Sequence, residues 1–282
     1  MRSETLQRHA GLLVALHAAS FWPVWRWYVD RLNDGSDEPW AIVALLAAAL
    51  LSWPRQGFRF DGRDPLIGAA ALLTLLYAAL APFTPPLVRA VVAMSALACS
   101  WVSIAGARER MPAIAGLLVL SVPVIASLQF YAGYPLRVVT ATGATGVLNL
   151  FGFDVVRVGT RMSAGVRTVL VDAPCSGVRM LWTACVLSCV LAALRPAVGW
   201  RSMSAALALI LPVVLLVNSV RAALLFLLET RPTPAPAALH SLVGIATFML
   251  AAALILASET AQQRWSGSSR GRAVRMAVGT PS

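Results

Sequence analysis

Residues 202–228 read SMSAALALILPVVLLVNSVRAALLFLL, an apolar run in which Arg221 is the only charged side chain. Because about 20 apolar residues in an α-helix cross a bilayer core of about 30 Å, this stretch predicts a membrane span with length to spare for a tilt. Further apolar runs follow the same pattern along the chain. We therefore expect an all-α integral membrane protein with about eight transmembrane helices, the others at about 10–29, 38–54, 65–81, 86–105, 111–131, 175–194 and 238–258.

The composition excludes an ordinary soluble domain, since 59% of the 282 residues are hydrophobic and only 12% are charged. The net charge of +11 comes from arginine alone, because the chain has no lysine. These arginines lie in short loops between the apolar runs, which is typical of charges that orient a membrane protein rather than of nucleic-acid binding. The lack of lysine indicates a GC-rich genome and favours a bacterial source.

The distribution of arginine predicts the orientation. With a cytoplasmic N-terminus, the short outer loops hold only Arg31, Arg89 and Arg231, beside an acidic cluster at 30–38. The connection 132–174 adds four arginines on that side over some forty residues. This positive-inside bias predicts a multi-pass protein of the bacterial inner membrane with both termini cytoplasmic. The arginines on the inner side are Arg2, Arg8, Arg55, Arg59, Arg63, Arg108, Arg110, Arg195, Arg201, Arg264, Arg270, Arg272 and Arg275.

The outer connection 132–174 is expected to be structured. Residues 137–151 mix threonine, glycine and apolar residues, which indicates a short interfacial helix or a partly re-entrant segment. The valine-rich stretches Asp154–Thr160 and Val166–Val171, each beside a glycine, predict a small outer β-hairpin before helix six. The hairpin either holds an extended peptide by edge pairing or only caps the helix ends.

Three regions follow from these patterns. Residues 1–110 are predicted to form the N-terminal transmembrane helices 1–4, and residues 111–262 a catalytic core with helices 5–8. Residues 263–282 are small, polar and basic, which predicts a disordered cytoplasmic tail.

Three ionisable side chains then fall at one depth near the outer face. Cys175 begins the sixth apolar run, Arg221 lies in the outer half of the seventh, and His240 begins the eighth. Such groups are costly in or beside a membrane span unless they have a function. A thiol, a guanidinium and an imidazole together make a nucleophile, an oxyanion stabiliser and an acid–base group. We predict membrane-embedded thiol chemistry that faces the periplasm.

The surroundings of Cys175 suggest how the thiol is activated. Pro174 suits the first turn of a helix, where the helix dipole favours the thiolate. Arg179 lies four residues on and is expected on the same face, so either Arg179 or Arg221 is a candidate to lower the thiol pKa. Arg221 needs a polar partner inside the protein, for which Asn218 and Glu229 are the candidates.

The remaining candidates are weaker. Ser176 is a nucleophile candidate only through its place next to Cys175, and we group it with Arg179 and Asn218 as substrate-binding or supporting residues. The other cysteines, at 99, 185 and 189, fit apolar packing and make no metal-binding pattern. The sequence implies neither a metal nor another cofactor.

At these residues the chain resembles the exosortase/archaeosortase family of membrane cysteine transpeptidase-like enzymes. The likeness covers roughly residues 120–258. The first four apolar runs match only as hydrophobic spans. One departure is Ala173, where family members often carry an acid two residues before the cysteine; here the acid is Asp172. The pieces that carry the resemblance are Cys175-Ser176-Gly177-Val178-Arg179, Asn218-Ser219-Val220-Arg221, His240 with Gly244, Leu128-Gln129, Gly152-Phe153-Asp154 and Val158-Gly159.

The resemblance implies a catalytic triad of Cys175, Arg221 and His240. It also implies substrates that are membrane proteins bearing a C-terminal sorting signal, cleaved outside the cytoplasmic membrane through a Cys thioester and passed to an envelope acceptor. The chief alternative is a multi-pass transporter or lipid-handling protein that binds an anionic substrate through Arg179 and Arg221. A non-catalytic scaffold of an envelope system is a third reading. Nucleic acid is not an expected partner.

Overall fold

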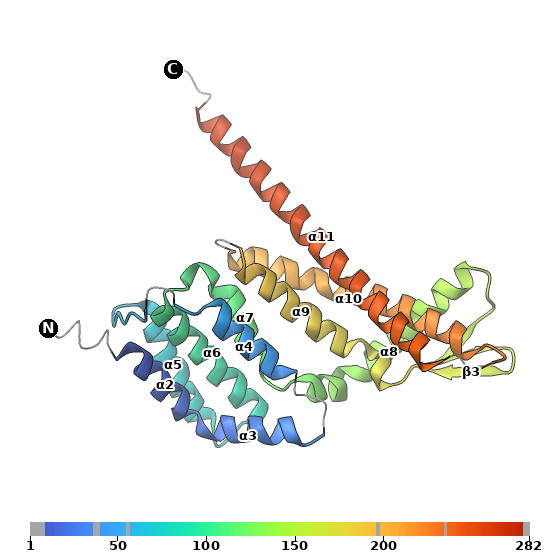
Figure 1. The fold of residues 1–282 in the computed structure, drawn as a ribbon, viewed down its shortest axis with the longest axis horizontal. Coiled ribbons are helices and arrows are strands. Elements are labelled where there is room, and N and C mark those ends of the chain that lie inside the picture. The colour runs from blue at the N-terminus through green and yellow to red at the C-terminus, as the bar shows by residue number, and fades with distance from the viewer. Residues whose placement is uncertain (1–8, 36–39, 55–56, 196–197, 234–235, 279–282) are drawn as a thin grey trace. The chain divides into compact units, whose positions relative to one another are not determined.

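The computed structural model describes residues 9–35, 40–54, 57–195, 198–233 and 236–278, the last stretch without the side chains of 262–278. The chain is mostly helical, with three short strands, as Figure 1 shows. The elements are α2 (Ala10–Ser20), α3 (Trp22–Asn33), α4 (Ala41–Leu51), α5 (Pro65–Leu80), α6 (Pro86–Ala105), η1 (Arg108–Arg110), α7 (Met111–Leu120), α8 (Ile125–Leu150), β1 (Val156–Val158), β2 (Arg161–Ala164), β3 (Arg167–Leu170), η2 (Ala173–Ser176), α9 (Val178–Ala193), α10 (Trp200–Glu229) and α11 (Ala237–Val278).

Among the described residues, three helices are long and apolar enough to cross a membrane: α6, α10 and the part of α11 up to Ala261. A fourth span is added if the pair Arg108–Leu120 and Ile125–Leu150, bent by 87°, counts as one. The chain is therefore a helical membrane protein, but the predicted count of about eight spans is not confirmed.

Helix length explains the difference. Four apolar runs form helices of 11 or 16 residues, which at 1.5 Å per residue reach about 17–24 Å and fall short of a core of about 30 Å. The run 10–29 is divided at Phe21 into α2 and α3, where Pro23 occupies the first turn of α3. The run 111–131 is broken between α7 and α8, beside Pro123.

The chain divides into two compact units. Unit 1 comprises Met1–Gly133 with Cys185–Ala205, and unit 2 comprises Tyr134–Ala184 with Ala206–Ser282. These units do not follow the expected boundary at residue 110, and the division into an N-terminal set, a core and a tail stays a prediction.

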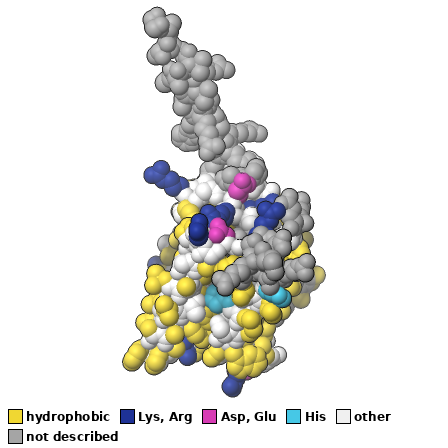
Figure 2. Space-filling model, turned by 90° about the vertical axis from the view of Figure 1, so that its left-hand side faces the viewer, with side chains coloured by type: hydrophobic (Ala, Val, Ile, Leu, Met, Phe, Trp, Pro, Cys, Tyr) yellow, Lys and Arg dark blue, Asp and Glu magenta, His cyan; other side chains and the backbone are white. Residues whose placement is uncertain are grey.

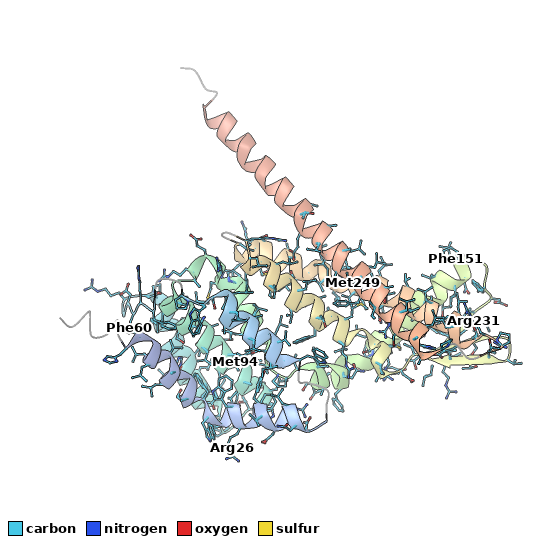
Figure 3. All side chains as sticks on the ribbon, viewed as in Figure 1. Arg26, Phe60, Met94, Phe151, Arg231 and Met249 are labelled. Carbon is cyan, nitrogen blue, oxygen red and sulfur yellow. The ribbon has the colours of Figure 1, made fainter. Side chains whose placement is uncertain are left out.

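Unit 1 is organised around α6, which packs against α2, α3, α5 and α7, while α4 packs against α7. Met94 of α6 is fully buried at the centre of this unit (Figure 3). One polar side chain joins three helices: His17 of α2 lies 2.9 Å from both the Ser100 hydroxyl on α6 and the Thr74 hydroxyl on α5.

Unit 2 has a core in which α8 and α10 pack together and the strands cover them. Its buried residues include Ala144 of α8, Met162 of β2 and Phe226 of α10. Small residues bring the two helices close, since a Cβ at Gly143 would overlap the Ser219 hydroxyl. On α11 the large apolar side chains of Ile245 and Met249 are exposed, at 62% and 60%. Such a surface is suited to lipid contact.

The outer connection contains a three-stranded antiparallel sheet of order β1-β2-β3. The predicted hairpin is therefore wrong in one respect, because β1 and β3, which lie in the two valine-rich stretches, do not pair with each other. Both pair with β2, in which Met162 lies opposite Arg157 on one side and Val169 on the other. The sequence of β2, RMSA, has no β-branched residue to mark it as a strand.

Two further expectations differ from the structure. Residues 137–151 are not a separate short helix, because nearly all of them belong to α8, which runs through Pro135 to Leu150; the interfacial or re-entrant position of this stretch stays a prediction. Residues 263–278, expected to be disordered, continue α11, whose alanine, arginine and glutamine residues favour a helix. Residues 279–282 lie outside the described part. Several charged residues on which the predicted orientation rests also lie outside the described part. They are Arg2, Arg8, Arg55, Asp37 and Glu38, and the side chains of Arg264, Arg270, Arg272 and Arg275.

The contact of α8 with α10 yields a test of the unit 2 core. We expect Gly143→Ala to destabilise the protein by about 1–3 kcal/mol, because its Cβ overlaps Ser219. The matched control is Gly146→Ala on the same helix, which has nothing within 4 Å and should be neutral or stabilising by up to about 1 kcal/mol. Thermal unfolding of the full-length protein in one detergent measures both. Adding Ser219→Gly should relieve Gly143→Ala, and equal melting temperatures for the two alanine variants would contradict the packing.

Candidate active site around Cys175

Cys175 lies in the short 3-10 turn η2, between the sheet and α9. Pro174 occupies the first turn of η2, and the Cys175 amide donates to the Asp172 carbonyl at 2.9 Å. The side chain is half-buried and packs against the unit 2 core formed by α8, α10 and the sheet. The thiol is therefore held at the junction of these elements.

The turn does not merge into α9. Gly177 adopts a left-handed conformation with φ +82° and separates Cys175 from the helix that begins at Val178. The Ser176 hydroxyl accepts a hydrogen bond from the Val178 amide at 3.3 Å, so it caps the start of α9. The expectation that Cys175 opens the α-helix is thus wrong, and Arg179 cannot be placed on its face by helical spacing.

Asn218 of α10 fixes the backbone of the turn. Its Nδ2 donates to the Cys175 carbonyl at 2.8 Å and to the Thr140 hydroxyl of α8 at 2.9 Å. Asn218 is 1% exposed, and its Oδ1 has no partner among the described residues. One amide group therefore links η2, α10 and α8.

Arg221 lies three residues after Asn218 on α10, and its positive charge acts on the Cys175 thiol. Its Nε is buried and has no hydrogen-bond partner among the described residues. The expected pairing with Asn218 or Glu229 is not found: Asn218 is occupied by Cys175 and Thr140, and Glu229 contacts His240.

The pKa of the Cys175 thiol is raised above its ordinary value. Burial is the main cause; the charge of Arg221 lowers the pKa, and the carboxylates of Asp172 and Glu229 raise it. Of the two arginines proposed to activate the thiol, Arg221 has this effect and Arg179 is not among the groups that shift it. The thiol is thus protonated at rest, contrary to the expectation of a thiolate favoured by a helix dipole.

His240 lies in the first turn of α11, where its Nε2 is 3.8 Å from Glu229 Oε1 at the end of α10. Both side chains are partly exposed, His240 at 36% and Glu229 at 46%. No hydrogen bond joins His240 to Cys175 among the described residues. The two are linked through Glu229, which contacts His240 and acts electrostatically on the thiol.

All six residues expected at the site thus fall in unit 2. The structure brings Cys175, Asn218 and Arg221 together and ties His240 to Glu229, while Arg179 is exposed on α9. The sequence did not indicate Thr140 as the second acceptor of Asn218, because 78 residues separate them. The sequence marks Gly177 only as one residue of the Cys175–Arg179 motif, and not as the left-handed residue that ends the turn. No cluster of three or more potential metal ligands occurs among the described residues.

Comparison with protein families identifies the chain. The family model described as transmembrane exosortase (Exosortase_EpsH) matches residues 3–257. The chain belongs to the transmembrane exosortase family. The match reaches further towards the N-terminus of this exosortase than the motifs at 120–258, so the first four apolar runs belong to the family's pattern as well. No curated protein and no solved structure matches the chain.

The charges around Cys175 predict opposite shifts in its titration. Arg221→Gln should move the midpoint of thiol alkylation to higher pH, because it removes a positive charge that stabilises the thiolate. Glu229→Gln should move the midpoint to lower pH, because it removes a negative charge that destabilises the thiolate. Arg167→Gln, on exposed β3, is the matched control and should leave the midpoint unchanged. The measurement is the alkylation rate of the Cys175 peptide against pH, followed by mass spectrometry of the full-length protein. Shifts of the same sign in both variants would contradict this electrostatic arrangement.

The left-handed turn at Gly177 predicts a second effect. Gly177→Ala should cost about 1–2 kcal/mol for the backbone conformation and more for displacing Asn218, whose Nδ2 would lie 3.0 Å from the new Cβ. Gly165→Ala has a similar φ of +59° with nothing within 4 Å, so it isolates the conformational cost. Thermal unfolding compares the two variants, and an equal loss would show that Asn218 does not constrain this turn.

Proposed function

We propose that this exosortase is a membrane-embedded cysteine protease or transpeptidase. It cleaves the C-terminal sorting signal of exported membrane proteins on the outer side of the bacterial cytoplasmic membrane. The observation that carries the proposal is the junction of η2 and α10. There Asn218 holds the backbone of Cys175, and Arg221, one turn further along the same helix, acts on its thiol.

In the first half-reaction the Cys175 thiol loses its proton and its sulfur attacks the carbonyl carbon of the scissile amide. Because the pKa of this thiol is raised, the step needs a base, and His240 is assigned that role. The new C–S bond turns the carbonyl oxygen into an oxyanion, which the Arg221 guanidinium stabilises. His240 then gives its proton to the leaving amine as the C–N bond breaks, which leaves a thioester on Cys175.

In the second half-reaction an acceptor amine, or water, attacks the thioester. His240 takes the proton of the attacking group and gives it to the Cys175 sulfur as the C–S bond breaks, which restores the thiol and the neutral imidazole. Glu229, 3.8 Å from His240, positions the imidazole and stabilises it when it is protonated. Asn218 positions the nucleophile through the Cys175 carbonyl and does not itself touch the reacting atoms.

The proposed partners are membrane proteins with a short motif, an apolar helix and a basic tail, the lipid bilayer, and an envelope acceptor. The orientation with both termini cytoplasmic belongs to this proposal and rests on the positive-inside bias. A transporter that binds an anion through Arg179 and Arg221 is the alternative to be tested. Of these two arginines, only Arg221 is among the groups that shift the pKa of the Cys175 thiol, which favours the enzyme.

Processing of a substrate in cells tests the proposal. We expect Cys175→Ala to abolish cleavage of a tagged protein with a C-terminal helix and basic tail, and Arg221→Lys to reduce it by about 10²–10³-fold, as for loss of an oxyanion donor. His240→Ala should also abolish it. The readout is an immunoblot of precursor and product, with the abundance of each variant measured in the same strain.

Matched controls separate chemistry from folding. Cys185→Ala removes another half-buried thiol, and Arg161→Lys changes an exposed arginine of β2; both should process normally. A thioester trapped by hydroxylamine in the parent and absent from Cys175→Ala would support the mechanism directly. Normal cleavage by Cys175→Ala at normal abundance would overturn it, and uptake of an anionic solute that depends on both Arg179 and Arg221 would replace it by the transporter.

A further inference from the structure

We propose that unit 1 contains a binding site for one anionic glycerophospholipid. Its phosphate lies against Arg59, Arg108 and Arg110, and an acyl chain lies in an apolar groove beside Trp53. The residues belong to unit 1, whereas the candidate active site lies in unit 2, so this site does not depend on the proposed catalysis.

The headgroup end is a cavity of about 720 Å³ at the end of α4 and the segment that joins α6 to α7. Three arginines line it, Arg59, Arg108 and Arg110, against one acid, Glu109. Arg110 donates to the Leu51 carbonyl at 2.7 Å, and Arg108 pairs with Asp64. These contacts hold two of the guanidinium groups in place at the cavity.

Asp64, which holds Arg108, is itself fixed at the start of α5. Burial raises the pKa of Asp64, but hydrogen bonds from Arg108, Ser103 and the Leu66 amide outweigh it, so the pKa lies below its usual range. The carboxylate therefore stays charged at neutral pH and keeps its pairing with Arg108. Asp64 and Asp61 both act on Arg108 from outside the cavity wall, in which three arginines face the single carboxylate of Glu109.

The tail end is a second cavity of about 470 Å³, lined by α2, α3, α4, α6 and α7, with no charged residue in its wall. Small residues such as Gly11, Ala15 and Ala48 open it, and its wall is otherwise aliphatic and aromatic. Trp53 lines both this cavity and the arginine cavity. Trp53 packs against Phe58 and Trp101, with ring centroids 5.9 and 6.2 Å away.

This combination matches an amphiphile with an anionic head. Guanidinium groups bind phosphate oxygens by paired, charge-assisted hydrogen bonds, and an uncharged groove accepts a hydrocarbon chain. Basic pockets between membrane helices are a recurring site for anionic lipids. The α4 helix beside the groove has 11 residues and reaches only about 17 Å, so it leaves bilayer depth for a chain to fill. A free phosphate would use the arginines but not the groove.

The surface agrees with this assignment. Figure 2, seen from the left-hand side of Figure 1, shows arginine side chains together with a few acidic ones in one zone of the face, above a largely hydrophobic area. Phe60, next to Arg59, marks this end of unit 1 in Figure 3, and Arg26 of α3 lies away from it. Arg26 is exposed and lines neither cavity, which makes it a matched control.

Lipid titration of the full-length protein, followed by native mass spectrometry from detergent, tests the headgroup. Phosphatidylglycerol and phosphatidylcholine with identical acyl chains are the probes. We expect the parent to prefer phosphatidylglycerol, and Arg59→Gln to reduce that preference about fivefold, with a similar loss for Arg110→Gln as the second variant. Arg26→Gln should keep the full preference. Equal binding of the two lipids by the parent, or an undiminished preference in both arginine variants at unchanged melting temperature, would overturn the site.

The groove is tested by filling it. Ala15→Trp, an exposed position in the groove wall, should weaken phosphatidylglycerol binding, whereas Ala19→Trp, exposed one turn on and outside the wall, should not. Soluble glycerol phosphate, which has the head without the chains, should compete poorly with the lipid. Full competition by glycerol phosphate, or equal binding in the two tryptophan variants, would mean a phosphate site only and would overturn the lipid assignment.

Discussion

The candidate active site depends on one buried amide. Asn218 uses both protons of its Nδ2 to join the Cys175 carbonyl to the Thr140 hydroxyl, and so fixes η2 against α8 and α10 at a single point. A buried polar group left without partners costs about 1–3 kcal/mol, so the apolar surroundings keep these bonds formed. The turn comes close enough only because Gly177 is left-handed and has no Cβ, which would lie 3.0 Å from the amide nitrogen.

The helix that carries the Asn218 amide also carries the charge that acts on the Cys175 thiol. Arg221 is one turn beyond Asn218 on α10, so the helix that holds the Cys175 backbone also sets the distance of the guanidinium from the thiol. Burial alone makes a resting thiol, and the Arg221 charge opposes it. In the proposed mechanism the Arg221 charge mainly stabilises the oxyanion that forms during the reaction, and not a thiolate that exists beforehand. A fixed cation in a partly water-free site can do this because no solvent has to reorganise when the oxyanion forms.

The sequence was sufficient for the long elements and for the motif, but not for their contacts. The length of the apolar run alone identified α10 and the start of α11 as candidate membrane spans, since about 20 consecutive apolar residues are typical of a transmembrane helix. It did not separate spans from the short helices α2, α4, α5 and α9, because composition does not show where a helix ends inside an apolar run. Spacing suggested local partners for Arg221 on its own helix. Its neighbour Asn218 instead bonds Cys175 and Thr140, which lie 43 and 78 residues earlier, and only packing reveals these partners.

The arginines of this chain occur in two different kinds of environment. After α6, Arg108 is held by Asp64 and Arg110 by the Leu51 carbonyl, and both line a cavity with Trp53. Arg221 instead has apolar neighbours on α10, and its buried Nε has no partner among the described residues. Such a donor in a membrane helix is unfavourable in the resting protein. In the proposed mechanism a substrate carbonyl at Cys175 gives this donor an acceptor, so substrate binding would relieve an unfavourable interaction that the fold itself maintains.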